Sequence, residues 1–271
     1  MRNTLEPGAE VITQARHGGK TWRAPQGFHF ANDEYLVKLT DAEIITFADH
    51  LPFAFQFTEN SWQALGMIGN PHTGNACVTS DGQWQSGYIP AILRGYPFDI
   101  TADQQAMLAI RENSGLVLDN YEGQPFFDAS GNLSPLLTKT RAFLVKVQEG
   151  RRKLSAAIRE LDRHGLLAPW ESFSAQLSLP GTGPDLLRVD EKRFRELPDR
   201  DYLRLRRANA ITLIYAQLYS QRRLPNLTRL TQLRHNHESN TDARYSDAMQ
   251  GGTSAENELI ALISKEMRDL K

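Results

Sequence analysis

The 271-residue sequence has a single cysteine, Cys77, and no long hydrophobic run. One cysteine excludes an internal disulfide and is typical of a reducing compartment. No stretch approaches the roughly 18 apolar residues that a membrane-spanning helix needs, and the first residues lack the apolar core of a signal peptide. We therefore expect a cytoplasmic protein without a membrane span.

Motifs for the common kinds of catalysis and metal binding are also missing. The glycines of residues 180–184 are not followed by Gly-Lys-Ser/Thr, so they do not form a phosphate-binding loop. No Ser-His-Asp, Cys-His or paired-carboxylate arrangement stands out, and His72 has no second ligand at metal-binding spacing. The sequence therefore indicates no metal and no cofactor, and it leaves open whether the protein is an enzyme.

The formal net charge is only −1, but the charges are distributed unevenly. Residues 1–134 carry 7 Lys+Arg and 15 Asp+Glu, whereas residues 135–234 carry 20 and 10. Such asymmetry can indicate a basic face for nucleic acid, or an acidic half that docks on a basic half of the same chain. The second interpretation fits better, because the basic residues are not interleaved with aromatic residues as in a single-strand binder.

Local signals predict an α+β fold with short antiparallel strands in the N-terminal half and helices in the C-terminal half. Short apolar segments bounded by Gly, Pro and Asn make residues 1–133 rich in strands, and Thr40 and Glu43 form a capping box that begins a short helix there. Ser134 and Pro135 begin the longest helix, which ends near His164. We expect residues 1–234 to form a single domain, helix-rich from 134 to 234.

The segment Gly150-Arg151-Arg152-Lys153 interrupts the apolar stripe of the longest helix. It predicts either a kink or a point where the helix leaves the body of the protein. Its charges belong either to a solvated face or to an anion site.

Residues 235–271 form a separate tail. A polar linker leads to a short amphipathic helix, in which Leu259, Ile260, Ile263, Met267 and Leu270 recur at helical spacing. An amphipathic helix on a flexible tether is typical of a docking segment. These five residues are therefore the candidate contacts to a partner protein, to a second copy of the chain or to the chain's own body.

The stretch DGQWQSGYIPAILRGYPF, residues 81–98, is unusually rich in aromatic residues, glycine and proline. It predicts a strand, a turn and a short helix that ends at Gly95 in a left-handed conformation. Its aromatic residues either belong to the core or line a pocket in which Arg94 binds a carboxylate or phosphate. The candidate ligand-binding residues are Trp84, Tyr88, Arg94 and Tyr96.

The same stretch resembles the signature region of the SapC family, which is associated with bacterial surface layers and repeats the pattern DG-x-W-x-x-GY-[IV]-PA-x-x-RRYPF. The similarity covers about residues 10 to 233. It includes the positions Arg16-His17, Leu39 to Glu43, Glu122 to Asp128 and Ile211 to Leu218. The sequence departs from the family pattern at Gly95, where the family has a second Arg, at Ala129 and at Gln217, where the family has a His.

The resemblance implies a non-enzymatic accessory or scaffold protein. Such a protein would act with a bacterial surface-assembly or export system, or with a neighbouring enzyme such as an oxygenase or a halogenase. The residues themselves leave two alternatives open: a protein that binds or converts a small anion in a Trp84/Arg94 pocket, and a nucleic-acid binder that uses the arginine-rich middle third. The resemblance carries no reaction with it.

Overall fold

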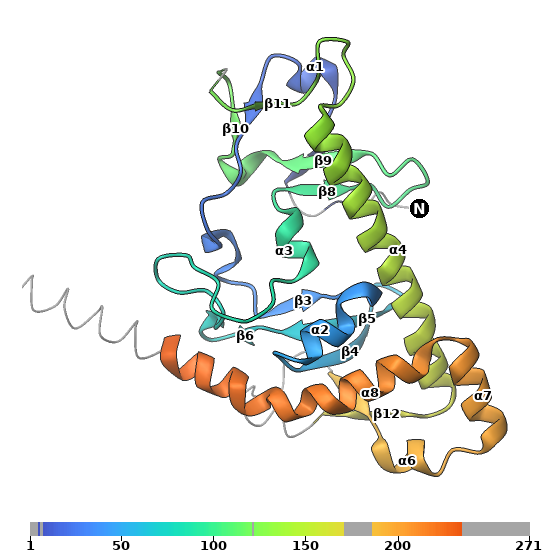
Figure 1. Cartoon of the computed structure of the whole chain (residues 1–271). Coiled ribbons are helices and arrows are strands. Elements are labelled where there is room, and N and C mark those ends of the chain that lie inside the picture. The colour runs from blue at the N-terminus through green and yellow to red at the C-terminus, as the bar shows by residue number, and fades with distance from the viewer. Residues whose placement is uncertain (1–4, 6–7, 121, 171–185, 235–271) are drawn as a thin grey trace, which may run out of the picture.

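The computed structural model describes residues 5, 8–120, 122–170 and 186–234 (Figure 1). Antiparallel strands lie mostly in the first half of the chain and helices in the second, which confirms the predicted α+β class. The predicted docking residues Leu259, Ile260, Ile263, Met267 and Leu270 lie outside the described residues.

The described strands form four sheets, and every strand pairing is antiparallel. The largest sheet has the order β12-β13-β4-β5-β3, and the smaller ones are β1-β9-β8, β10-β2-β11 and β6-β7. The strands are β1 (Ala9–Val11), β2 (Thr21–Trp22), β3 (Leu36–Lys38), β4 (Phe53–Thr58), β5 (Ser61–Met67), β6 (Gly69–Asn70), β7 (Gly74–Asn75), β8 (Phe98–Ile100), β9 (Leu108–Arg111), β10 (Val117–Leu118), β11 (Gln124–Pro125), β12 (Leu167–Pro169) and β13 (Leu187–Val189).

The described helices include one long helix, α4, and several short ones. They are α1 (Gln14–His17), α2 (Ile44–Ala48), α3 (Ala91–Gly95), α4 (Pro135–Arg163), α6 (Glu191–Arg195), α7 (Asp199–Arg207) and α8 (Ala210–Ser220), with the 3-10 turns η1 (His29–Ala31), η2 (Asp41–Glu43), η3 (Glu112–Ser114) and η4 (Gln221–Arg223). A further helical run covers 224–234.

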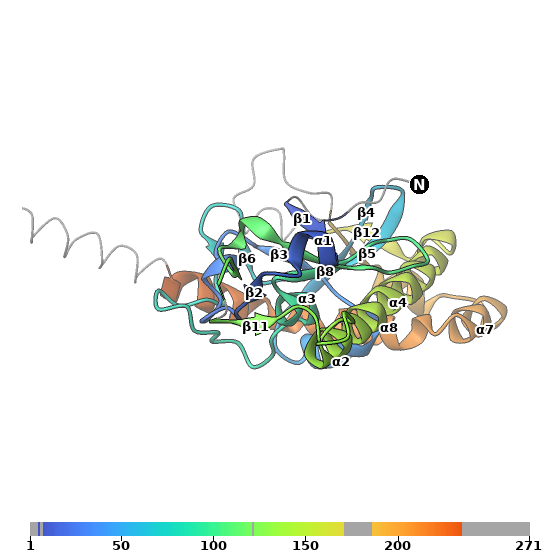
Figure 2. The ribbon, with the colours of Figure 1, turned by 90° about the horizontal axis from the view of Figure 1, so that it is seen from above.

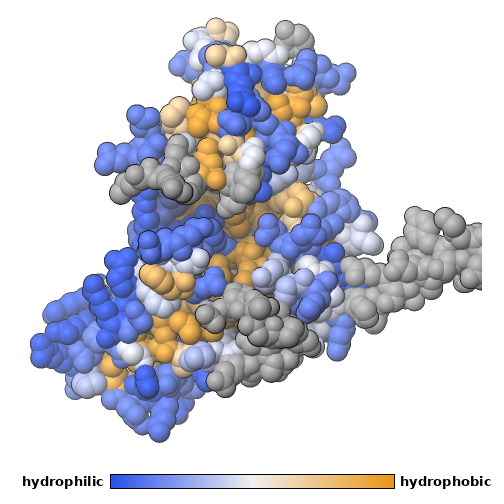
Figure 3. Space-filling view, turned by 180° about the vertical axis from the view of Figure 1, so that it is seen from behind, coloured by the Kyte–Doolittle hydropathy of each residue, from blue (hydrophilic) through white to orange (hydrophobic). Residues whose placement is uncertain are grey.

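The helix α4 passes from one end of the molecule to the other and lies along one side of the strands (Figures 1 and 2). It begins as predicted, because Ser134 accepts a hydrogen bond from the N–H of Leu137 and Pro135 occupies the first helical position. On the face seen in Figure 3 the molecule is hollowed in its middle, and apolar residues gather there.

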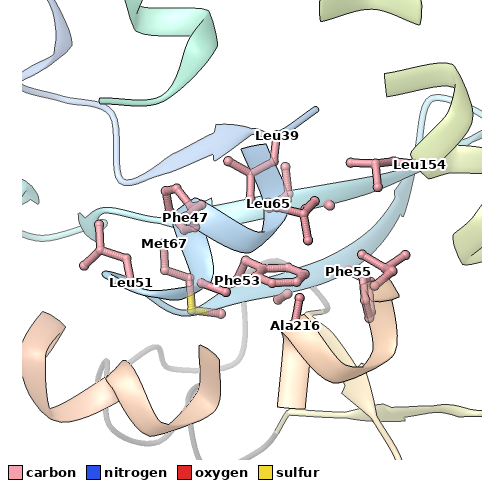
Figure 4. Packing of buried hydrophobic residues seen from close by; sticks show 14 of the residues in the cluster. Leu39, Phe47, Leu51, Phe53, Phe55, Leu65, Met67, Leu154 and Ala216 are labelled. Carbon is pink, nitrogen blue, oxygen red and sulfur yellow. The ribbon is translucent and has the colours of Figure 1, made fainter. Parts of the chain in front are cut away.

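The larger hydrophobic cluster is built on the β4–β5 hairpin, whose register runs from Phe53↔Gly66 to Thr58↔Ser61. The two turn residues, Glu59 and Asn60, both have positive φ, as a tight two-residue hairpin turn requires. Figure 4 shows side chains of α2, α4 and α8 converging on the two strands.

A second hydrophobic cluster lies at the other end of α4. Leu137 and Leu144 from the first half of the helix pack there with Trp22, Phe98 and Phe126. Leu154, Ala157, Ile158 and Leu161 from the second half belong to the larger cluster. The helix therefore takes part in both cores.

The signature stretch connects the two clusters. Leu93 of α3 belongs to the larger cluster and Phe98 of β8 to the smaller one. The turn at Gly82, with a φ of 79°, and the short helix after Pro90 are as predicted. The left-handed conformation expected at Gly95 is wrong: the residue is helical, and a Cβ there would lie 2.8 Å from Leu144 of α4. A side chain at this position would require the end of Leu144 to shift, so glycine favours the close contact between the two helices.

The long helix continues through Gly150, as its predicted ends require, but the suggestion that it leaves the body of the protein at this residue is wrong. A Cβ at Gly150 would lie only 1.9 Å from Oγ1 of Thr40. Gly150 thus allows η2 to approach the helix, and the helix stays in the body of the protein on both sides of it.

The charge distribution predicted that opposite charges join the two halves of the chain, and the structure shows such a contact beside contacts of other kinds. Lys153 and Asp41, whose charged atoms lie 3.6 Å apart, form an ion pair that joins the two halves. Arg141 and Arg152 of α4 donate instead to backbone carbonyls of residues 102–106. Apolar packing along α4 therefore accounts for most of the contact.

Gln217 of α8 bridges two neighbouring strands of the largest sheet. The strands β13 and β4 share only the pair Leu187↔Phe55. The buried Gln217 side chain accepts a hydrogen bond from the N–H of Val189 (3.1 Å) and donates one to the carbonyl of Phe53 (3.2 Å). Where the family pattern has a histidine, this chain thus uses an amide to connect two strands.

Candidate functional site

One buried carboxylate holds the beginning of the signature helix. Glu43 is 2% exposed. One of its oxygens accepts from the N–H of Thr40 at 2.8 Å, which is the predicted capping box. The other accepts from the N–H of Ala91, the first residue of α3, at 2.7 Å. A single side chain therefore caps two helical segments that lie almost fifty residues apart in the sequence.

A short hydrogen-bond chain connects Glu43 to Arg94. The hydroxyl of Tyr88 donates to Oε2 of Glu43 at 3.2 Å and accepts from Nη2 of Arg94 at 3.0 Å. The guanidinium also lies 5.6 Å from the centroid of the Tyr88 ring and 5.4 Å from that of Phe143. Among the described residues, the other N–H groups of Arg94 have no acceptor. The exposed cation is thus held in place but keeps donors for a ligand.

The protonation of this chain follows from its burial. Loss of water raises the pKa of Glu43 above its ordinary value, and the hydrogen bonds from Ala91, Thr40 and Tyr88 and the charge of Arg94 oppose that rise. Burial, followed by the charge of Glu43, raises the pKa of Tyr88. The phenol therefore keeps its proton at neutral pH and remains the donor to Glu43.

Arg94 stands at the rim of a hollow of about 380 Å³, which we call the aromatic pocket. Two ring contacts shape it: Trp22 meets Phe98 edge-on at 4.7 Å, and Phe30 stacks on Tyr96 at 3.8 Å. The indole N–H of Trp22 is buried and has no acceptor among the described residues. The lining consists of Trp22, Ala24, Pro25, Gly27, Phe28, Phe30, Leu93, Arg94, Gly95, Tyr96, Phe98 and Thr140.

The four candidate ligand-binding residues have different positions in this arrangement. Arg94 and Tyr96 line the aromatic pocket, whereas Trp84 and Tyr88 do not. Trp84 packs against Phe28, with ring centroids 5.5 Å apart, and its N–H donates to the carbonyl of Tyr88 at 2.9 Å. Trp84 and Tyr88 thus support the pocket wall and the orientation of Arg94 from outside.

Sequence reasoning missed the aromatic residues that the opening segment contributes. Trp22, Phe28 and Phe30 come from residues interpreted as loop and strand, and Phe98 ends the signature stretch. The close spacing of three aromatic residues at 22, 28 and 30 is a signal, but only the folded chain shows that they face Arg94.

A smaller hollow of about 250 Å³ lies beside the aromatic pocket and shares Phe30, Leu93 and Tyr96 with it. Charged residues line its other side, and Arg111 lies 5.6 Å from the centroid of the Tyr96 ring. The stacked rings of Phe30 and Tyr96 therefore form a wall common to both hollows.

Arg16 and His17, which match another family position, are bound to Glu112. Arg16 donates to both carboxylate oxygens, and Nε2 of the buried His17 lies 3.1 Å from Oε1 in poor alignment for a hydrogen bond. Burial is the largest cause of the shift in the His17 pKa, and the pKa is lowered. This group therefore ties α1 to η3.

The part of the chain that the structure describes contains no group of three or more His, Cys, Asp or Glu side chains placed to hold a metal ion. In the same part, no helix has the length and apolar character that crossing a bilayer requires.

Comparison with known proteins gives one match. The model of the SapC family matches residues 12–227, which is most of the chain and includes every residue of the aromatic pocket. No curated protein and no solved structure shows a significant match.

Proposed function

This chain belongs to the SapC family, and we propose that it is a non-enzymatic accessory protein that holds a planar, carboxylate-bearing small molecule in the aromatic pocket. The observation that carries this proposal is Arg94. Its guanidinium is oriented by Tyr88 at the rim of the pocket and forms no ion pair with a described residue.

The pocket suits a ligand with a flat apolar body. Its volume of about 380 Å³ falls in the range of small-molecule sites. Five aromatic side chains supply faces and edges for stacking, and the N–H of Trp22 would gain an acceptor from the ligand. A carboxylate at the rim would receive two parallel hydrogen bonds from Arg94.

The buried carboxylate next to this pocket supports binding over catalysis. Glu43 already accepts three hydrogen bonds and does not line the pocket. Its role is to hold the start of α3 and, through Tyr88, to orient Arg94.

A matched pair of ligands tests the proposal. We expect 2-naphthoate to raise the melting temperature and to bind in calorimetry, and the neutral 2-naphthamide to bind at least about tenfold more weakly, since a charged hydrogen-bond pair contributes about 1.5–3 kcal/mol. Arg94→Gln should remove this preference for the carboxylate.

Arg23→Gln is the control, because Arg23 is an exposed arginine next to Trp22 that does not line the pocket. Equal binding of the acid and the amide, or a preference for the acid that survives Arg94→Gln, would contradict the proposal.

A second candidate function, docking to a partner protein, is favoured by exposed tyrosines on α7 and α8. Tyr202, Tyr215 and Tyr219 are 38%, 56% and 43% exposed, and the first two flank Phe194. Tyrosine is enriched in protein interfaces. We propose that this tyrosine face contacts a cytoplasmic component of a surface-assembly or export system, or a neighbouring enzyme such as an oxygenase or a halogenase.

The double variant Tyr215→Ser/Tyr219→Ser tests the docking role. Immobilised wild-type chain should retain, from an extract of the native cells, a protein that the double variant loses. Leu136→Ser, an exposed apolar residue on α4, should retain it. Equal retention by all three chains would exclude the tyrosine face as the interface.

A further inference from the structure

A third and larger hollow lies where α4 packs against β5. It has a volume of about 550 Å³. Four cationic side chains line it, Lys38, Arg151, Arg152 and Arg159, whereas Glu59 is its one carboxylate. We call it the cationic hollow.

Ion pairs within the described part of the chain do not cancel the charges of three of the four cations in the hollow. Among the described residues, Lys38, Arg152 and Arg159 form no ion pair, and the neighbouring Lys153, which does pair with Asp41, does not line the hollow. Arg152 donates to the carbonyl of Ala102 at 3.2 Å, and Arg151 to that of Lys38 at 3.4 Å. The carbonyl acceptor orients the Arg152 guanidinium without neutralising it.

The α4 residues that line the hollow lie at helical spacing. Gln148, Arg151, Arg152, Ser155 and Arg159 are three, four, seven and eleven positions apart from the first, so they form one face of the helix. Opposite them, Ser61 and Gln63 come from β5, and the hydroxyls of Ser61 and Ser155 lie 3.2 Å apart. The hollow is thus lined by neutral hydrogen-bond donors as well as by cations.

We propose that the cationic hollow binds the polyphosphate group of a small molecule. Guanidinium forks match the oxygens of phosphate, and several neighbouring cations suit a ligand with several adjacent charges better than a single carboxylate. Single-stranded nucleic acid requires aromatic platforms for its bases. The one aromatic residue of this lining, Trp62, is only 8% exposed.

Binding of inorganic tripolyphosphate and of ATP to the full chain tests the proposal. In about 50 mM salt we expect tripolyphosphate to raise the melting temperature, and the double variant Arg152→Gln/Arg159→Gln to bind it at least about tenfold more weakly. Arg163→Gln, on the same helix but outside the hollow and paired with Glu160, should bind as the wild type does. Tighter binding of ATP than of tripolyphosphate would identify a nucleotide as the ligand, and the reverse order a free polyphosphate.

Three outcomes would overturn the proposal. They are the absence of binding by either polyphosphate, equal weakening by Arg163→Gln, and displacement of tripolyphosphate by an oligonucleotide that binds more tightly and depends on the same two arginines. The last result would identify a nucleic-acid site. Binding of 2-naphthoate by the double variant should stay unchanged, so that this test is separate from that of the aromatic pocket and also confirms folding.

Discussion

Glu43 is buried without a cation in direct contact, and hydrogen bonds take the place of an ion pair. Two backbone N–H groups and the Tyr88 hydroxyl donate to its oxygens. An unpaired buried charge is costly unless it is hydrogen-bonded. The carboxylate therefore depends on the geometry of η2 and α3, and each of these segments depends on it.

Replacing Glu43 with glutamine should destabilise the protein by about 1–3 kcal/mol, because the new amide N–H₂ group must face one of two backbone donors. The loss should also vary with pH. Since burial raises the Glu43 pKa, the folded chain holds this proton where the unfolded chain has released it. The stability from this group is present below its ordinary value of 4.5 and is lost as pH rises through the native pKa.

Urea unfolding of the wild type and of Glu43→Gln between pH 4 and 8 measures this effect. The stability difference between the two chains should shrink as pH rises. Glu149→Gln, at an exposed position of α4, should change stability by less than about 0.5 kcal/mol. A difference that is constant with pH would show that ionisation of Glu43 is not linked to folding.

Half of the role of Glu43 could be predicted from the sequence. The spacing of Thr40 and Glu43 indicates the capping box, since both residues belong to one turn. The bond to Ala91 joins segments that only the tertiary fold brings together. The same limit applies to the aromatic pocket: Arg94 and Tyr96 could be proposed from their local pattern, but the contribution of Trp22, Phe28 and Phe30 could not.

Among the elements, α8 connects the strands β13 and β4 through the side chain of Gln217. Gln217→Leu should lower the free energy of unfolding by about 2–4 kcal/mol, because it leaves the N–H of Val189 and the carbonyl of Phe53 buried without these partners. Gln217→His, which restores the residue of the family pattern, should retain part of the stability, since an imidazole can both accept and donate.

Denaturant unfolding of these two variants and of Gln232→Leu, an exposed position in the helical run 224–234, checks this prediction. A loss in Gln217→Leu no larger than that in Gln232→Leu would mean that the two hydrogen bonds add nothing to stability.

Both ends of α4 could be predicted from the sequence, but the reason for a glycine inside it could not. The beginning of α4 at Ser134 and its termination before Gly165 follow from local capping chemistry, and Gly165 has the expected positive φ. The presence of Gly150 inside α4 does not follow from local chemistry, because a glycine inside a helix is explained only by the residues that contact it. Here the contact is Thr40, more than a hundred residues away.

For the whole molecule, the α+β class followed from the order of strand and helix signals, but the charge distribution was misleading. The surplus of basic residues after residue 134 does more than contact the acidic half. Part of it lines the cationic hollow, where the described residues leave Arg152 and Arg159 without ion pairs. The net charge of a segment shows where basic residues lie in the sequence, but it does not show which groups they contact in the fold.

The stacked pair of Phe30 and Tyr96 separates the aromatic pocket from the smaller hollow beside it, and Lys38 and Arg151 line both that hollow and the cationic one. The smaller hollow therefore shares lining residues with both the aromatic pocket and the cationic hollow. A ligand that tilts the rings of Phe30 and Tyr96 would widen one of the two hollows beside them and narrow the other.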